Sequence, residues 1–220
     1  MKYYVEIELL EEAEIKLGFI WKKLYTQIHL SLVELLNEED KAILGLSDSI
    51  KTHKTKDLEN KISIGLSFPN YQQNKFPLGE KLRLFAKTKE ELEKLNLAHW
   101  LRRLMDYVTI SEIQKIPANI DSFVSFSRKR FKSNSEIRRL AKRYAKREGI
   151  EYEEALKKFV ETEEKYEKVK KENKLPYINI QSLSSNQELK LFIEKKERDK
   201  PKDGLFSTYG LSHESTVPSF

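Results

Sequence analysis

Cysteine is absent from this chain of 220 residues. The absence excludes disulfides, thiol nucleophiles and cysteine-ligated zinc, and it fits a reducing compartment. No apolar run approaches the ~20 residues that a membrane-spanning helix needs. The opening segment, MKYYVEIELL, alternates in polarity and lacks the apolar centre of a signal peptide. We therefore expect a cytoplasmic protein that does not enter a membrane.

Glycine and histidine are also scarce. The seven glycines are scattered and form no phosphate-binding loop. The four histidines have no metal-ligand spacing; they are His29, His53, His99 and His213. Paired carboxylates are plentiful, but their pattern is typical of surface charge. The sequence therefore predicts neither a metal centre nor a cofactor.

Apolar residues make up 39% of the chain, which is enough for a packed core. Residues 1–120 carry 18 Lys and Arg and 18 Asp and Glu, whereas residues 121–220 carry 23 and 17. The whole net charge of +6 therefore lies in the second half. Such an asymmetry is expected if the second half binds an anion.

The most basic segment is 127–147, SRKRFKSNSEIRRLAKRYAKR, with ten Lys and Arg against one acid, Glu136. Its second part predicts a helix that Asn134 or Ser135 can cap. Steps of three and four place six cations on one face: Arg138, Arg139, Lys142, Arg143, Lys146 and Arg147. A run of cations is usually a solvated face. Because the acids needed for intrahelical pairs are missing here, we favour binding along a nucleic-acid backbone.

The first half predicts the order β-α-β-β-α-β, with a polar surface excursion over 37–61. The expected strands are 3–9, 62–68, 81–86 and 107–115, and the expected helices are 13–36 and 88–106. Thr88 and Glu91 have capping-box spacing, and the second helix is expected to break near Asn96. This order predicts a ferredoxin-like (RRM-like) domain over residues 1–118, a fold that many RNA-binding domains use.

Residues 119–220 predict a second, RNA-binding domain, with the boundary near Pro117–Asp121. A strand over 123–131 leads into the basic helix, and a strongly charged helix is expected over 151–173. Strands are expected at 177–182, 188–195 and 205–211. The fold class is therefore α+β, with an arginine-rich helix in the carboxyl-terminal half.

Taken singly, the polar residues that could carry chemistry have ordinary positions. His29 lies at the edge of an apolar helical stripe, beside Ile28. Ser182 and Ser184 are typical of a turn, and Tyr209 is typical of a strand. Periodicity and spacing do not unite them.

Several strings, in order, resemble the CRISPR-associated endoribonucleases that process precursor CRISPR RNA in type I-F systems, the Csy-type family. They are YYVEIEL, IHLSLV, GLSFP, PLGEKLRL, SRKRFKSN, LPYINIQSLSSNQELKLFI, and YGLS followed by VPSF. The resemblance covers nearly the whole chain except 37–61 and part of 151–173. Both stretches look like insertions relative to shorter members of the family.

The resemblance implies cleavage at the 3′ base of a stem-loop in the repeat RNA, without a metal. The 2′-hydroxyl before the break attacks the adjacent phosphate and leaves a 2′,3′-cyclic phosphate. By resemblance His29 is the base, Ser182 holds the ribose hydroxyl in line, and Tyr209 orients the histidine. The family also implies that this protein, a monomer on its own, stays on the cut RNA as a subunit of the type I-F surveillance complex.

RNA recognition is implied in the same way. Arg128 matches an arginine that reads the lower stem, and Arg130 stands where the family has a glutamine, so readout of a G·C pair is retained. Leu189 stands where the family stacks an aromatic on the terminal base pair. Groove contacts are implied for Lys142, Arg143, Lys146 and Arg147, and contacts to the scissile nucleotide for Gln181 and Ser184.

Two alternatives stay open at this point. The chain can be a non-catalytic subunit that holds an RNA hairpin, since the fold and the basic helix suffice for that. It can also be a DNA-binding regulator with a basic helix. Such regulators usually dimerise on paired half-sites, and this sequence has no dimerisation heptads.

Overall fold

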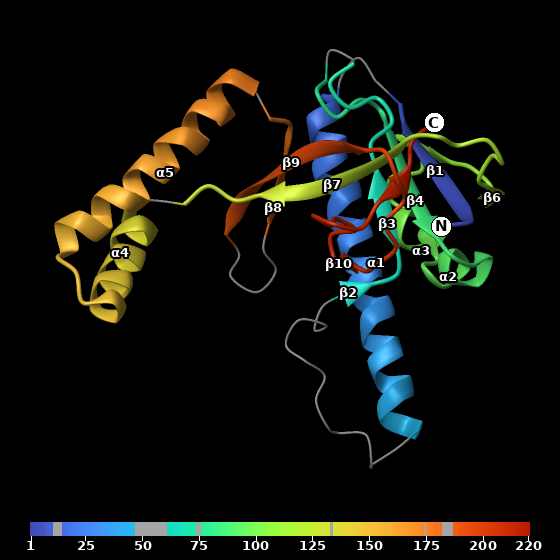
Figure 1. Ribbon diagram of the computed structural model, residues 1–220. Coiled ribbons are helices and arrows are strands. Elements are labelled where there is room, and N and C mark those ends of the chain that lie inside the picture. The colour runs from blue at the N-terminus through green and yellow to red at the C-terminus, as the bar shows by residue number, and fades with distance from the viewer. Residues whose placement is uncertain (11–14, 47–60, 74–75, 133, 174, 182–186) are drawn as a thin grey trace. The chain divides into compact units, whose positions relative to one another are not determined.

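The computed structural model describes residues 1–10, 15–46, 61–73, 76–132, 134–173, 175–181 and 187–220, with backbone alone for 38–46 and 163–173. The chain forms two compact units (Figure 1). The larger unit combines residues 1–128 with 176–220, and the smaller unit is residues 129–175. The domain boundary predicted near residues 117–121 concerns domains that fold independently, and it stays a prediction.

The first sheet of the larger unit is antiparallel and has the order β3-β4-β1-β5, with β6 also paired to β1. The strands are β1 (Tyr3–Leu9), β3 (Gly65–Ser67), β4 (Lys81–Ala86), β5 (Val108–Ile110) and β6 (Gln114–Lys115). β1 and β4 confirm the predicted bounds. The single strand expected over 107–115 is wrong, because Ser111 interrupts it: its hydroxyl accepts a hydrogen bond from the Glu6 amide at 2.9 Å.

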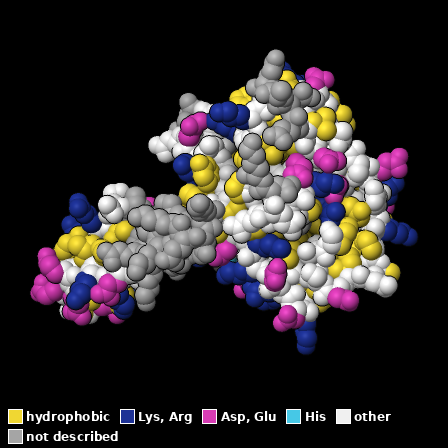
Figure 2. All heavy atoms as spheres, turned by 90° about the horizontal axis from the view of Figure 1, so that it is seen from above, with side chains coloured by type: hydrophobic (Ala, Val, Ile, Leu, Met, Phe, Trp, Pro, Cys, Tyr) yellow, Lys and Arg dark blue, Asp and Glu magenta, His cyan; other side chains and the backbone are white. Residues whose placement is uncertain are grey.

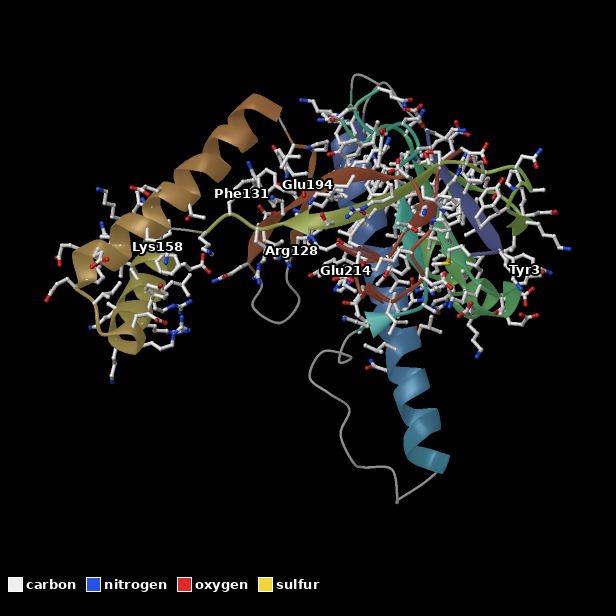
Figure 3. All side chains as sticks on the ribbon, viewed as in Figure 1. Tyr3, Arg128, Phe131, Lys158, Glu194 and Glu214 are labelled. Carbon is white, nitrogen blue, oxygen red and sulfur yellow. The ribbon has the colours of Figure 1, made fainter. Side chains whose placement is uncertain are left out.

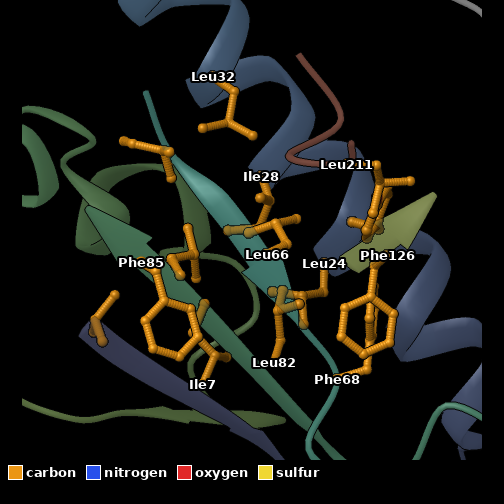
Figure 4. Packing of buried hydrophobic residues seen from close by; sticks show 14 of the residues in the cluster. Ile7, Leu24, Ile28, Leu32, Leu66, Phe68, Leu82, Phe85, Phe126 and Leu211 are labelled. Carbon is orange, nitrogen blue, oxygen red and sulfur yellow. The ribbon is translucent and has the colours of Figure 1, made fainter. Parts of the chain in front are cut away.

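Helix α1 (Leu17–Leu46) packs its apolar stripe against this sheet. Figure 4 shows Leu24, Ile28 and Leu32 of α1 among buried residues of this sheet, which include Leu66, Leu82 and Phe85. The predicted end at residue 36 is wrong, because the helix continues for ten more residues. The segment NEEDKAILGL contains no proline and mostly good helix formers, so nothing in it stops the helix before Gly45.

Two short helices follow β4, namely α2 (Lys89–Lys94) and α3 (Leu97–Leu101). Thr88 and Glu91 form the predicted capping box, in which the side chain of each residue accepts a hydrogen bond from the backbone amide of the other. Asn96 has a φ of 44°, in the left-handed region. The predicted break in this helical segment is therefore confirmed at Asn96.

The second sheet has the order β11-β7-β9-β8. Its strands are β7 (Phe123–Lys129), β8 (Tyr177–Gln181), β9 (Glu188–Arg198) and β11 (Val217–Pro218). A separate pair joins β2 (Lys61–Ile62) to β10 (Phe206–Ser207). The strand expected over 205–211 is wrong beyond Ser207, because the chain turns there and the Gly210 amide donates to the Ser207 carbonyl at 2.7 Å.

The two sheets share one hydrophobic core. The Phe68 ring, just after β3, meets the Phe126 ring of β7 edge-on at 5.1 Å between centroids. Gly65 lies so close to β10 and β11 that a Cβ added there would lie 2.6 Å from the Phe206 ring and 2.7 Å from Val217. The carboxyl-terminal strands therefore pack directly on the amino-terminal sheet.

The smaller unit is a helix pair, α4 (Asn134–Glu148) and α5 (Tyr152–Asn173), joined at Gly149, whose φ is +68°. Among its described side chains, Ile137 is buried, and three alanines form a buried cluster flanked by partly buried apolar side chains: Ala141, Ala145 and Ala155. The predicted caps are wrong, because α4 begins at Asn134 and includes Ser135, so neither residue precedes the helix as a cap does. Helices with antiparallel sheets nevertheless confirm the α+β class.

Candidate active site and RNA-binding surface

His29 lies on α1 beside the fully buried Ile28, at the edge of the stripe that faces the core. Its own side chain is half-buried. The ring nitrogen Nδ1 lies 2.8 Å from the backbone carbonyl oxygen of Thr208. A carbonyl oxygen can only accept, so Nδ1 carries the proton and donates it. In the neutral ring Nε2 is therefore left with its lone pair, as a general base requires.

Burial also favours the neutral ring. Loss of solvent lowers the pKa of His29 below its ordinary value of about 6.5, and the hydrogen bond to Thr208 opposes this shift only in part. The neutral imidazole is thus the dominant form at pH 7. A base in this state is ready to accept a proton without first losing one.

Tyr209 stacks on the imidazole. The two rings are parallel within 4°, with their centroids 4.2 Å apart. The stacking fixes the plane of the His29 ring, and the Thr208 hydrogen bond fixes its rotation within that plane. Two residues adjacent in sequence therefore hold the base in one orientation.

The turn that carries these contacts is itself held in place. The buried Tyr25 hydroxyl donates to the Tyr209 carbonyl at 2.8 Å, and the Leu66 amide donates to the Gly210 carbonyl at 2.9 Å. Gly210 has a φ of +68°, and a Cβ there would collide with Leu66. Glycine is thus required both by the backbone conformation and by the space. The turn is anchored to α1 and to β3 at once.

Arg128 lies at the carboxyl end of β7 (Figure 3). The centre of its guanidinium group lies 5.7 Å from the centroid of the Tyr209 ring, within cation–π range. The structure therefore brings three predicted residues together from distant parts of the sequence: His29, Arg128 and Tyr209. Arg130 follows just after β7, and its side chain is exposed.

The hairpin of β8 and β9 lies against α1. Gln181 ends β8 with an exposed side chain, and Leu189 is partly buried opposite Ile180. Glu188 forms a 2.5 Å ion pair with Lys22 of α1. Lys22 precedes His29 by two helical turns, which is about 10 Å along the helix axis. Ser182 and Ser184 lie outside the described residues, so their positions are not part of the observed site.

The predicted cations of α4 all have exposed side chains: Arg138, Arg139, Lys142, Arg143, Lys146 and Arg147. Arg147 pairs with Glu148 at 2.7 Å and also lies 5.3 Å from the Tyr144 ring centroid. Lys158 of α5, labelled in Figure 3, donates to the Tyr144 hydroxyl at 2.9 Å. The apolar side of α4 is covered by α5, so its basic side is presented to solvent.

Charge elsewhere is more evenly mixed. Figure 2 shows Lys and Arg side chains interspersed with Asp and Glu over the face of the larger unit. In the part of the chain that the structure describes, no three His, Asp or Glu side chains gather as a metal site would require. None of the described helices has both the length and the apolar character to cross a membrane.

Sequence reasoning missed two contributors to the site. Tyr25 precedes His29 by one helical turn, and this i, i+4 spacing could have linked them. Thr208 acts through its backbone carbonyl, which no side-chain pattern reveals. Neither residue is among those that the resemblance to the family marks as functional.

The geometry around His29 has the parts of a general-base site, and α4 adds a basic surface to the chain. A family model described as CRISPR-associated protein (Cas_Csy4) matches residues 4–220. The chain therefore belongs to the Cas_Csy4 family of CRISPR-associated proteins, and the resemblance identified from the sequence is confirmed.

Two curated relatives carry the name CRISPR-associated endonuclease Cas6/Csy4. The relative from Escherichia coli (strain UTI89 / UPEC) is 30% identical over 221 aligned residues, which cover 100% of both chains. The relative from Pseudomonas aeruginosa (strain UCBPP-PA14) is 33% identical over 158 residues, covering 71% of this chain and 79% of the relative.

Proposed function

We propose that this protein is an endoribonuclease that cleaves precursor CRISPR RNA at the 3′ base of the repeat stem-loop, with no metal in the reaction. One observation carries the proposal: the Nδ1–H of His29 is committed to the Thr208 carbonyl, and Tyr209 stacks on the same ring. A neutral imidazole held so firmly, with Nε2 left to accept a proton, is the central requirement for hydroxyl activation. Both relatives are named as endonucleases, which supports the same activity for this chain.

In the proposed reaction Nε2 of His29 removes the proton of the 2′-hydroxyl at the cleavage site. The 2′-oxygen forms a bond to the adjacent phosphorus while the bond from phosphorus to the 5′-oxygen breaks. The leaving oxygen takes up a proton and becomes a 5′-hydroxyl, and the other product ends in a 2′,3′-cyclic phosphate. Ser182, which follows Gln181, is proposed to align the 2′-hydroxyl, because in-line geometry supplies much of the rate.

The RNA stem is proposed to bind along the exposed cations of α4, with Arg128 and Arg130 reading its lower base pairs. Gln181 and Ser184 are proposed to contact the scissile nucleotide, and Leu189 to offer an apolar surface to the end of the stem. The guanidinium of Arg128 lies near Tyr209, which supports a position for Arg128 close to the reacting phosphate. A cation there would also stabilise the charge that develops on the phosphate oxygens.

Two wider proposals follow. The strand order β3-β4-β1-β5, with α1 and the α2–α3 segment as crossovers, supports a ferredoxin-like domain in the amino-terminal half. The protein is proposed to act in the cytoplasm and, after cutting, to stay on the hairpin as a subunit of a type I-F complex. Retention after cutting has a physical basis, because cleavage at the base of the stem leaves contacts to the stem intact.

The test is to incubate the purified protein with a labelled type I-F repeat hairpin in EDTA. A parallel substrate carries a 2′-deoxy nucleotide just before the expected break. Cutting of the all-ribose RNA alone, at the 3′ base of the stem, is the expected result. Tight binding without cutting of either substrate would make the protein a non-catalytic hairpin-binding subunit, and preference for duplex DNA at matched salt would make it a DNA-binding protein.

A further inference from the structure

A second surface lies on the larger unit, between the first turns of α1 and the α3 segment. It is a cavity of about 500 Å³. Three aromatic and three cationic side chains line it: Phe19, Trp100, Tyr107, Lys23, Arg102 and Arg103. The aliphatic side chains of Ile15 and Leu104 also line the cavity. The size suits one or two large side chains.

The rim of this cavity exposes unusually large apolar groups. Phe19, which lines the cavity, is 54% exposed, the highest value for a large hydrophobic side chain among the described residues. Met105, which follows the lining residue Leu104 in the sequence, is 49% exposed. Leu10 is 37% exposed, and its amide donates to the Tyr107 carbonyl at 2.9 Å, which places it beside the same cavity. Apolar patches of this kind on a monomer usually mark a contact surface.

The described lining of the cavity is cationic. Within the described residues Lys23, Arg102 and Arg103 form no ion pair, and no acidic side chain lines the cavity. Residues 11–14, which precede Ile15, lie outside the described part. The Lys23 ammonium lies 5.5 Å from the Phe19 ring centroid, so charge and apolar surface are adjacent. A complementary partner carries apolar side chains next to Asp or Glu.

This surface is separate from the proposed active site. Phe19 and Lys23 are one turn apart on α1, and at 3.6 residues per turn their face lies about 100° around the helix from His29. A ligand bound there leaves the imidazole and the Tyr209 turn uncovered. The surface therefore calls for an occupant other than the scissile nucleotide.

We propose that this cavity, defined by Phe19, Trp100, Arg102, Arg103 and Tyr107, docks an acidic segment of a protein subunit encoded in the same CRISPR locus. The inference rests on the proposed function, because it assigns a surface to the proposed complex. Trp, Tyr, Met and Arg are the residues enriched in the centre of protein interfaces. The aliphatic wall suits an inserted side chain better than a stacked RNA base, which needs a flat aromatic platform.

The experiment co-expresses the full chain with the other proteins of its locus and a repeat RNA, and measures co-elution on a sizing column. Phe19→Asp and the double variant Arg102→Glu/Arg103→Glu should weaken assembly by more than about tenfold, as expected at an interface hot spot. RNA cleavage and the melting temperature should stay at wild-type values, because these side chains are exposed. Leu205→Asp and Lys89→Glu/Lys94→Glu are matched controls on other exposed sites and should assemble normally.

Each other result overturns the inference. Normal assembly of both variants, or failure of the wild-type chain to assemble with any protein of the locus, removes this docking site. Weaker binding of the repeat RNA by the variants, with assembly intact, makes the cavity an RNA contact instead. Cleavage by the wild-type chain in the same preparation separates these outcomes from a failure of the proposed function, in which the wild-type chain does not cut at all.

Discussion

The unit that holds His29 and the helix pair that holds the α4 cations differ greatly in how much side chain they bury. Around His29 two sheets and α1 enclose a core with Trp21, Tyr25 and Phe68 almost fully buried. Among the described side chains of the helix pair, those buried are Ile137 and three alanines, while Tyr144, Leu156 and Phe159 are partly exposed. A base must be held within a fraction of an ångström, whereas a charged surface needs only approximate placement. The proposed base thus lies in the unit whose described side chains are the more deeply buried.

The largest effect is expected from His29→Ala, which removes the proposed base. The cleavage rate should fall by roughly 10²–10⁴-fold, while affinity for the hairpin stays within a few fold. Single-turnover cleavage and filter binding at the same salt measure the two quantities. His99→Ala, on α3, is the matched control and should cut normally. A His29→Ala protein that still cuts at the wild-type rate would refute the assignment of the base.

The double variant Arg143→Ala/Arg147→Ala tests the proposed RNA contact of the α4 cations. Binding should weaken, and the slope of log affinity against log salt should flatten by roughly one unit for each phosphate that the variant no longer neutralises. The rate at saturating RNA should stay near wild type. Lys89→Ala/Lys94→Ala removes the same charge from α2 and should leave the slope unchanged. An unchanged slope in the α4 variant would mean that this face does not touch the backbone.

The pH profile of kcat/KM should report the environment of His29 in the free enzyme. The neutral ring is the active form, and burial lowers its pKa. The rate should therefore be level at neutral pH and fall about tenfold per unit once the pH drops below that pKa. We expect the midpoint below 6.5, the ordinary value for histidine. A midpoint above 6.5 would contradict the desolvated, neutral ring.

Phe159→Ala should show how thin the packing of the helix pair is. The Phe159 ring meets Tyr144 edge-on at 5.6 Å between centroids, so its removal takes away an aromatic contact between α4 and α5. Hydrogen exchange of the α4 amides should accelerate, because the free energy of opening the helix pair should fall by about 1–3 kcal/mol. Exchange of the β1 and β4 amides should stay unchanged. Val160→Ala, the next residue and exposed, is the control. Equal acceleration in β4 would mean that the two units unfold together.

Tyr25→Phe is expected to have the smallest effect. It removes one hydroxyl that donates to the Tyr209 carbonyl, so the free energy of unfolding should fall by about 0.5–1.5 kcal/mol. Cleavage should slow by only a few fold, since the Thr208 contact to His29 remains. Urea unfolding measures the first quantity, with Tyr177→Phe, an exposed tyrosine, as control. A variant as stable as wild type would show that this hydrogen bond does not stabilise the turn.

Several elements of the larger unit were predictable, because they have local signatures. The single strand expected over 62–68 is wrong, since the chain forms β2 (Lys61–Ile62) and β3 (Gly65–Ser67) in different sheets. The alternation of YYVEIEL sets β1, and Thr88 with Glu91 sets the start of α2. The end of α1 was not predictable from polarity, since polar residues with good helix propensity also extend an exposed helix. The interruption at Ser111 was missed because a side-chain hydroxyl there takes the place of a backbone partner.

The candidate site was predictable only through resemblance. His29, Arg128 and Tyr209 lie far apart in the sequence, and no local pattern links them. Their proximity depends on β7 and the 207–211 turn reaching the same edge of α1, which is a property of tertiary packing. The backbone contact of Thr208 has no signature in side-chain chemistry at all.

That contact has a consequence for how the site can change over generations. Because Thr208 contributes only its main-chain carbonyl to His29, its side chain is free to drift without altering the base. A single-residue insertion or deletion between Ser207 and Gly210 would instead shift the carbonyl and the Tyr209 ring out of register together. Selection should therefore act on the length of this turn more strongly than on the identity of residue 208.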